Sequence, residues 1–196
     1  SKADLAIEFT GPHSAFQNIS ACLEFGIPVV SGSTGWTERL DEIKKRCAET
    51  NGAFIYSSNF SVGVNLFFEL NKKLAGLMAD HPDYEVILEE IHHTQKKDAP
   101  SGTAITLAEQ LLERIKRKKQ WVNQLSELPE DLEIISQRID PCPGTHKVTY
   151  SSPIDTIEII HTAHNRKGFA LGAVLAAEFL QNKKGCYTMK EVLNIV

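Results

Sequence analysis

Residues 89–104 read EEIHHTQKKDAPSGTA, and this stretch determines how the rest of the chain is interpreted. It contains two histidines, two lysines and an aspartate, followed by a Pro-Ser-Gly-Thr turn. Before it, apolar and β-branched residues from Tyr84 onward predict a largely buried strand. After it, apolar residues between Ile105 and Ile115 recur at helical spacing, which predicts a helix with one buried face. A polar, cationic segment between two such elements can bind an anion and protonate it.

The adjacent histidines His92 and His93 have two interpretations. On a continuing strand their side chains would point to opposite faces. Both can serve one site only if the strand ends at this pair, and the polar residues 94–97 favour such an end. The alternative is a pair of solvated histidines at the end of a strand.

Ser101 is the predicted N-cap of the helix that follows. The first N–H groups of a helix have no partners within it and carry the positive end of its dipole, so those of Gly102 and Thr103 are available to a carboxylate or phosphate. Gly102 also allows an anion to approach the backbone closely. With the histidines and Lys96 nearby, the sequence predicts a cation-rich anion site with a titratable acid beside it.

These residues resemble the motif of a known family. The pattern Glu90-x-His92-His93-x-x-Lys96-x-Asp98-Ala99-Pro100-Ser101-Gly102-Thr103-Ala104 is similar to that of the dihydrodipicolinate reductases, also called 4-hydroxy-tetrahydrodipicolinate reductases. Further similarities lie at Phe9-Thr10, residues 32–35, residues 59–65, Arg166 and Phe169. The resemblance implies hydride transfer from NADH or NADPH to a small cyclic unsaturated dicarboxylate, which gives tetrahydrodipicolinate in the diaminopimelate route to lysine.

The resemblance and the side-chain chemistry together suggest catalytic and binding roles. Hydride addition to a conjugated ring leaves electron density on a neighbouring carbon, which then needs a proton. A histidine ordinarily titrates near about 6.5, so His92 is expected to be the proton donor. Lys96 is expected to neutralise a carboxylate and to stabilise developing charge, with a possible second role in proton donation. The residues expected to bind substrate are His93, Ser101, Gly102 and Thr103.

Two acidic residues of the motif have less direct roles. Asp98 is expected to orient the loop rather than to touch substrate. Glu90 is either a surface acid at the strand end or a supporting partner of a histidine, and both alternatives remain open. A zinc site built on His92 and His93 is not expected, because adjacent histidines lack the i, i+4 spacing of a helical zinc pair and no third ligand stands out. No metal site is therefore predicted.

The N-terminal region alternates between strands and helices. Strands are predicted at 4–9, 28–32 and 53–56, with helices at 15–26 and 37–48 between them, which favours a parallel sheet with right-handed crossovers. Ligands bind beyond the carboxyl ends of such strands. The residues expected there to bind the cofactor are Phe9, Thr10, Gly32, Ser33, Thr34, Ser57, Ser58, Asn59 and Phe60.

The predicted fold class is α/β, with a partial Rossmann-type parallel sheet and an α+β domain that contains a mixed sheet. Residues 1–60 and 167–196 are expected to form a partial dinucleotide-binding domain, and residues 61–166 a substrate-binding and oligomerisation domain. A Gly-rich turn after a first strand normally holds the pyrophosphate, and no such turn occurs here. The chain is thus expected to lack the N-terminal part of this domain. The alternative function is a non-catalytic fragment that binds the dicarboxylate but not the nucleotide.

Further elements follow from the same patterns. Helices are predicted at 61–78, 168–180 and 188–196, the last with Thr188 as N-cap and Glu191 three residues later. Residues 121–131 are predicted to be a loop, and strands are predicted at 132–138, 146–152 and 156–164. The resemblance implies that the sheet of these strands packs against its copies in a homotetramer.

Composition limits the class of protein. The net charge of −4 gives no general attraction to nucleic acid or to an acidic membrane, and the basic run at residues 114–119 is interpreted as a solvated helix end. No apolar run reaches the length of a membrane span. The four cysteines form no C-x-x-C pair, and the sequence opens without a signal peptide, so a cytoplasmic protein is expected.

Overall fold

The computed structural model describes residues 3–195, so Ser1, Lys2 and the predicted last helical residue, Val196, lie outside the described part. The chain divides into two compact units. Of the described residues, the first unit comprises 3–65 and 167–195, and the second comprises 66–166. Each unit has its own sheet and its own hydrophobic core.

The first unit is built on a parallel sheet. Its strands are β1 (Ala6–Glu8), β2 (Val29–Ser31), β3 (Ala53–Tyr56) and β9 (Gly185–Tyr187), in the order β1-β2-β3-β9. Every neighbouring pair is parallel, so the carboxyl ends of the strands share one edge. The helical elements are α1 (Ala15–Glu24), η1 (Thr37–Arg39), α2 (Leu40–Glu49), α5 (Lys167–Leu180) and α6 (Met189–Val192).

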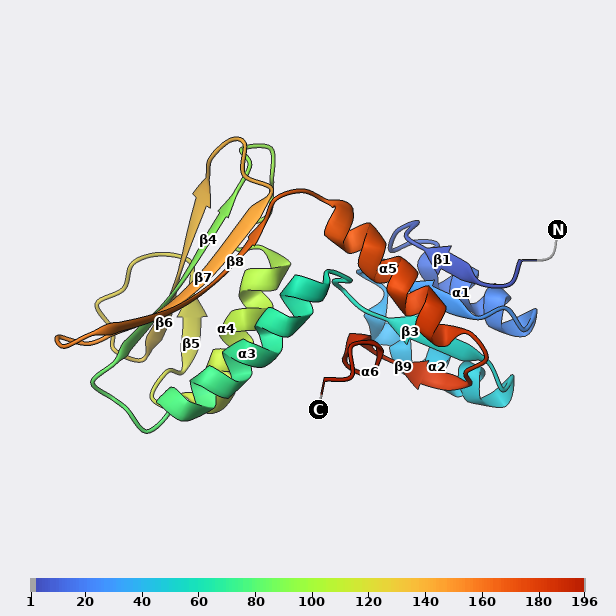
Figure 1. Cartoon of the computed structure of the whole chain (residues 1–196), viewed down its shortest axis with the longest axis horizontal. Coiled ribbons are helices and arrows are strands. Elements are labelled where there is room, and N and C mark those ends of the chain that lie inside the picture. Colours follow the sequence, from blue (N-terminus) through green and yellow to red (C-terminus); the bar gives the residue numbers. More distant parts are fainter. Residues whose placement is uncertain (1–2, 196) are drawn as a thin grey trace. The chain divides into compact units, whose positions relative to one another are not determined.

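Helices cover both faces of this sheet (Figure 1). Val29 packs in one core with residues of α1 and α2, whereas its neighbour Val30 packs in a second core with residues of α5 and α6. This follows from the alternation of side chains along a strand. The near-continuous apolar strands are typical of a parallel sheet buried on both faces. The predicted α/β class with a Rossmann-type sheet is confirmed.

Two C-terminal features differ from the predictions. Strand β9 was not predicted, because three residues reading Gly-Cys-Tyr carry no alternating pattern, and its pairing with β3 creates it. The closing helix is shorter than predicted and spans only Met189–Val192. Its capping box is confirmed, since Thr188 and Glu191 satisfy each other's backbone N–H groups.

The second unit contains a mixed sheet. Its strands are β4 (Glu85–His92), β5 (Gln120–Val122), β6 (Asp131–Arg138), β7 (Gly144–Ser151) and β8 (Thr156–Ala163), in the order β5-β6-β4-β7-β8. Strand β4 pairs parallel with β6 and antiparallel with β7. Helices α3 (Val62–Met78) and α4 (Gly102–Arg114) lie on the same face of this sheet (Figure 1). Their apolar sides share one core with β4, β6 and β7.

Strand β4 carries polar residues on its buried face. Val86, Leu88, Glu90 and His92 are buried, and the residues between them are more exposed. The first two belong to the hydrophobic core under α3 and α4. Because side chains alternate along a strand, Glu90 and His92 continue the same face beyond the core. This alternation places both residues beneath the start of α4.

Two predictions for the segment after α4 were wrong, one of them only in part. Part of the expected loop forms strand β5, which pairs parallel with β6. The basic run is a solvated helix end only in part: Arg114, Lys116 and Lys119 are exposed, but Lys118 is only 4% exposed. Its ammonium group donates to the carbonyls of Pro129 and Asp131 at 2.9 and 2.8 Å and also pairs with Glu85. The run therefore ties the end of α4 to the sheet.

Among residues 3–195, no helix is both long enough and apolar enough to span a lipid bilayer.

Candidate active site

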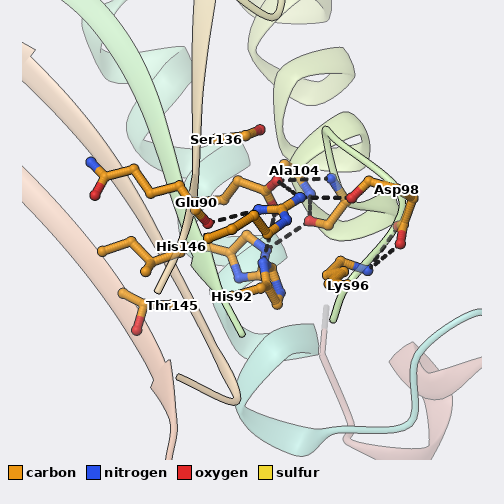
Figure 2. A network of polar contacts seen from close by, with 12 residues as sticks. Glu90, His92, Lys96, Asp98, Ala104, Ser136, Thr145 and His146 are labelled. Atoms are coloured by element: carbon orange, nitrogen blue, oxygen red, sulfur yellow. Dashed lines mark hydrogen bonds and ion pairs between the residues drawn. The ribbon is translucent and has the colours of Figure 1, made fainter. Parts of the chain in front are cut away.

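The site in the second unit is organised by strand register. On β4, Glu90 lies opposite Ser136 of β6 and opposite His146 of β7, and His92 lies opposite Arg138 of β6. Cross-strand neighbours on one face bring their side chains together. Residues far apart in the sequence thus form one cluster around Glu90 (Figure 2).

Glu90 is a fully buried carboxylate with partners from three elements. Its Oε1 accepts from the Ser101 backbone N–H at 3.1 Å and from Arg138 Nη2 at 3.0 Å. Its Oε2 lies 3.1 Å from His92 Nδ1 and 3.8 Å from His146 Nε2. Burial alone would raise the pKa of Glu90, but its polar neighbours His92, Ser101, Ser136 and Arg138 hold this pKa far below its usual range. Glu90 is therefore an ionised partner of a histidine and not a surface acid.

His92 is held with its two ring nitrogens in different surroundings. Its Nδ1 faces the Glu90 carboxylate, and its ring packs edge-on against His146 with centroids 5.1 Å apart. Its Nε2 lies beside Gly144, where a Cβ atom would come within 3.0 Å of this nitrogen. The glycine thus leaves space at the nitrogen that does not face the carboxylate.

His146 is a buried, neutral histidine. Burial, followed by the positive charge of His92, lowers the pKa of His146 to about 3. Its Nε2 lies 3.0 Å from Ser101 Oγ, which connects strand β7 to the start of α4. Sequence reasoning missed this residue, because a lone histidine on an alternating strand carries no signal of its partners.

Ser101 is the N-cap of α4, as predicted. Its hydroxyl accepts from the Ala104 N–H at 3.2 Å, its own N–H is donated to Glu90, and its side chain also contacts His146. Ser101 is only 3% exposed. Gly102 is exposed and Thr103 is half-buried, and their N–H groups belong to the unpaired first turn of the helix. The donors that face outward at this helix end are thus those of Gly102 and Thr103.

Lys96 and His93 lie on the loop that follows β4. Lys96 Nζ is 2.7 Å from both carboxylate oxygens of Asp98, whose backbone carbonyl accepts from Arg138 at 2.6 Å. The Lys96 hydrogen bond, more than any other contact, lowers the pKa of Asp98. His93 lies near Asp140, which accepts from the backbone N–H and the hydroxyl of Thr94. The strand ends at the histidine pair, as expected, and each histidine has its own carboxylate.

At the edge of the first unit, a second buried carboxylate links two of the predicted cofactor residues. Glu8 accepts from the N–H and hydroxyl of Thr10 at 2.8 and 2.6 Å, and from the hydroxyls of Ser31 and Ser33 at 2.5 and 2.8 Å. Burial would raise the pKa of Glu8, but these hydrogen bonds lower it. Sequence reasoning missed Glu8, although an acid at the end of an apolar strand was a usable signal.

The other predicted cofactor residues divide into exposed and structural ones. Phe9 is 54% exposed and packs so closely on Gly32 that a Cβ there would lie 2.1 Å from the ring. Phe60 is only 2% exposed and lies in the core, with its ring centroid 5.7 Å from that of Phe9. Ser57 donates to the Asn59 carbonyl at 2.6 Å, and Asn59 Oδ1 accepts from the N–H of Ser61. Thr34 and Ser58 are exposed.

The position and chemistry of these residues are compatible with a bound nucleotide. They place an exposed aromatic ring, hydroxyl groups and free turns at the shared carboxyl edge of parallel strands, which is where such sheets bind nucleotides. Glu8 has its acceptor sites filled by the protein and holds the turns in place.

A metal ion fits the second-unit cluster less well. Glu90, His92 and His146 offer ligand atoms within 4.8 Å of one another, a group that differs from the His92 and His93 pair considered in the sequence. However, Arg138 already neutralises the carboxylate at 3.0 Å, and Lys96 adds positive charge nearby. These cations oppose a further divalent charge, so the cluster is interpreted as a hydrogen-bonded ion pair.

The fold and the site together define a two-part α/β protein of the nucleotide-dependent oxidoreductase class. The family described as "Dihydrodipicolinate reductase, N-terminus" matches residues 1–60, and "Dihydrodipicolinate reductase, C-terminus" matches residues 63–193. The chain belongs to the dihydrodipicolinate reductase family, whose members are NAD(P)H-dependent oxidoreductases.

Individual relatives agree with this assignment. A 4-hydroxy-tetrahydrodipicolinate reductase of Christiangramia forsetii is 56% identical over 97% of this chain and 80% of its own length. The enzyme of the same name from Alkaliphilus oremlandii is 37% identical over 98% of this chain and 81% of its own length. The solved structure of a dipicolinate-bound dihydrodipicolinate reductase from Paenisporosarcina sp. TG-14 has a TM-score of 0.75 at 26% identity, covering 98% of this chain and 74% of that one.

Proposed function

We propose that the chain reduces 4-hydroxy-tetrahydrodipicolinate to tetrahydrodipicolinate with NADH or NADPH, in the diaminopimelate route to lysine. The observation that carries the proposal is the position of His92, with the ionised Glu90 on one ring nitrogen and Gly144 beside the other. The names of the relatives support this substrate. The solved relative is described as bound to dipicolinate, which is a planar dicarboxylate.

Each step has a candidate residue. When bound, NADH or NADPH supplies a hydride, and the residues that would hold it are Phe9, Thr10, Gly32, Ser33, Thr34, Ser57, Ser58, Asn59 and Phe60. The 4-hydroxyl group of the substrate leaves as water, which gives a conjugated ring. The reduction of this ring is completed when His92 donates a proton from Nε2 to the carbon next to the site of reduction. Lys96 neutralises a substrate carboxylate and is well placed to do so, because its present partner Asp98 is largely exposed.

The substrate carboxylates are held at the helix start. The N–H groups of Gly102 and Thr103 carry the positive end of the α4 dipole. His93 provides a further donor from the loop, and Ser101 holds the first turn in place from below. Charged acceptors make stronger hydrogen bonds than neutral ones, so a dianion gains most from this arrangement.

Steady-state turnover with each nucleotide tests the proposal. We expect oxidation of NADH or NADPH that depends on the dicarboxylate substrate and is inhibited by pyridine-2,6-dicarboxylate. The alternative, a fragment without catalysis, predicts that calorimetry detects pyridine-2,6-dicarboxylate but not nucleotide binding.

We also propose that the second unit assembles into a homotetramer through the uncovered face of its sheet. Within residues 3–195, Figure 1 shows both helices of the second unit on the opposite face. The uncovered face carries Ile160, which is 56% exposed, beside Lys147 and its carboxylate partners Glu89 and Glu158. Light scattering on the intact chain should give four times the chain mass, and Ile160→Glu should reduce it. A monomer at micromolar concentration would contradict this proposal.

A cytoplasmic location is proposed on the basis of cysteine chemistry. Cys22, Cys47, Cys142 and Cys186 are all free thiols, which fits a reducing compartment.

A further inference from the structure

We infer that Glu90 is a positioning residue for His92: its carboxylate fixes the Nδ1 side of the imidazole, so that Nε2 carries the transferable proton toward the substrate. This inference rests on the proposed function, in which His92 protonates the substrate. Glu90 is fully buried, so it acts on the substrate through His92 and not by direct contact.

Contacts with residues other than His92 hold the Glu90 carboxylate in position. Arg138 on β6 and the Ser101 N–H at the start of α4 both bind Oε1, at 3.0 and 3.1 Å. Its Cα position is fixed by pairing of β4 with both neighbouring strands. Three separate elements therefore determine where the second oxygen lies (Figure 2). Groups held in this way orient their partners with little reorganisation.

The second carboxylate oxygen of Glu90, Oε2, faces His92. Oε2 lies 3.1 Å from His92 Nδ1, but neither atom completes a well-aligned hydrogen bond within the described residues. A buried donor and acceptor left without a bond are costly. A small rotation of the His92 ring would align them, and no side chain at Gly144 blocks Nε2.

His146 does not compete for this role. It is neutral, and its Nε2 is 3.0 Å from Ser101 Oγ but 3.8 Å from Glu90 Oε2. The charged and titratable groups around His92 are thus Glu90 on its own strand, Arg138 on β6, His146 on β7 and Lys96 on the loop. Among residues 3–195, Glu90 is the anion that faces His92 directly at 3.1 Å, whereas Asp98 pairs with Lys96, so Glu90 stabilises the imidazolium form.

The inference predicts a defined kinetic pattern for Glu90→Gln in the full chain. The amide keeps the shape of the side chain and an acceptor for Ser101 but removes the charge. We expect kcat to fall by roughly 10- to 10³-fold, a part of what a general acid contributes. KM and the affinity for pyridine-2,6-dicarboxylate should stay within about threefold, and the basic limb of the kcat pH profile should move to lower pH.

Two variants serve as controls. Glu109→Gln neutralises an exposed acid on α4, outside the site and the proposed interface, so its kcat and pH profile should match the wild type. Glu90→Asp keeps the charge, so its pH limb should stay near the wild-type position even if kcat falls. A merely structural role for Glu90 predicts instead that both Glu90 variants lose kcat and ligand affinity together with an unchanged pH limb, and that result overturns the inference.

A measurement on the wild type covers the case in which Glu90→Gln does not fold. In ¹⁵N spectra of histidine-labelled protein, neutral His92 should carry its proton on Nδ1, the nitrogen beside the carboxylate. A proton on Nε2 in the neutral ring would refute the inference. If the wild-type chain shows no reductase activity, the proposed function fails, whereas the position of this proton still decides the role of Glu90.

Discussion

His146 Nε2 lies 3.0 Å from Ser101 Oγ, which joins the middle of the sheet in the second unit to the N-cap of α4. The same serine donates its N–H to Glu90, and Glu90 faces His92. A chain of contacts therefore runs from the helix start to the proposed proton donor. Ser101 is therefore the residue through which the start of α4 contacts the carboxylate that faces the proposed proton donor.

Replacing His92 by Gln removes the proposed proton donor and leaves the binding groups in place. We expect kcat to fall by roughly 10²- to 10⁴-fold with little change in KM. Steady-state kinetics across a range of substrate concentrations measures both. Normal turnover by this variant would remove His92 from the mechanism.

Lys96→Ala should affect binding as well as catalysis. A hydrogen bond to a charged group contributes about 1.5–3 kcal/mol, so loss of the ammonium should raise KM by roughly 10- to 100-fold. It should also lower kcat. The neighbouring Lys97→Ala is the matched control, because Lys97 is an exposed residue of the same loop. An unchanged KM in the Lys96 variant would argue against its pairing with a carboxylate.

His146 should make the protein sensitive to acid. Its pKa is about 3 in the folded chain, against 6.5 as its ordinary value, so the unfolded chain binds more protons between these limits. The free energy of unfolding must therefore fall as pH decreases from 6.5 towards 3. Glu90, whose folded pKa is depressed, adds its own loss only at lower pH, below its ordinary value of 4.5.

His146→Gln separates these two contributions. Glutamine can still bond to Ser101 but does not titrate, so chemical denaturation between pH 6.5 and 4.5 should show a shallower loss of stability than the wild type. Some slope should remain, because burial also lowers the pKa of His161. Identical slopes in both proteins would mean that His146 titrates normally when folded.

Two glycines, Gly172 in the first unit and Gly76 in the second, test how closely their helices are packed. At Gly172 in α5, a Cβ atom would lie 1.7 Å from the Phe60 carbonyl oxygen, so Gly172→Ala should cost about 1–3 kcal/mol or more. Gly76 in α3 has no atom within 4 Å of the same position, so Gly76→Ala should stabilise by about 0.5–1 kcal/mol. Thermal unfolding of both variants gives the comparison. Equal effects would contradict the close approach of α5 to Phe60.

Local patterns in the sequence predicted most of the fold. The alternation around Leu88, the helical spacing from Ile105 and the cap at Ser101 each depend on neighbouring residues and were confirmed. Strands β5 and β9 depend on long-range pairing, and the burial of Lys118 depends on carbonyls beyond its own helix, so none of these had a local signal.

The site was predicted in part for the same reason. The motif contains Glu90, His92, Lys96 and Ser101 in one stretch, but it could not decide whether Glu90 was exposed. That was decided by partners on other strands, Arg138 and His146, which strand register brings together. The roles of the predicted substrate and cofactor residues stay predictions.

The central claim is that a ring dicarboxylate binds at the start of α4 beside His92. A crystal structure of the chain with pyridine-2,6-dicarboxylate tests this most directly. The account predicts one carboxylate on the N–H groups of Gly102 and Thr103, with Lys96 within ion-pair distance and His92 Nε2 facing the ring. Binding of the dicarboxylate elsewhere on the chain, or a His92 ring turned away from it, would contradict the account.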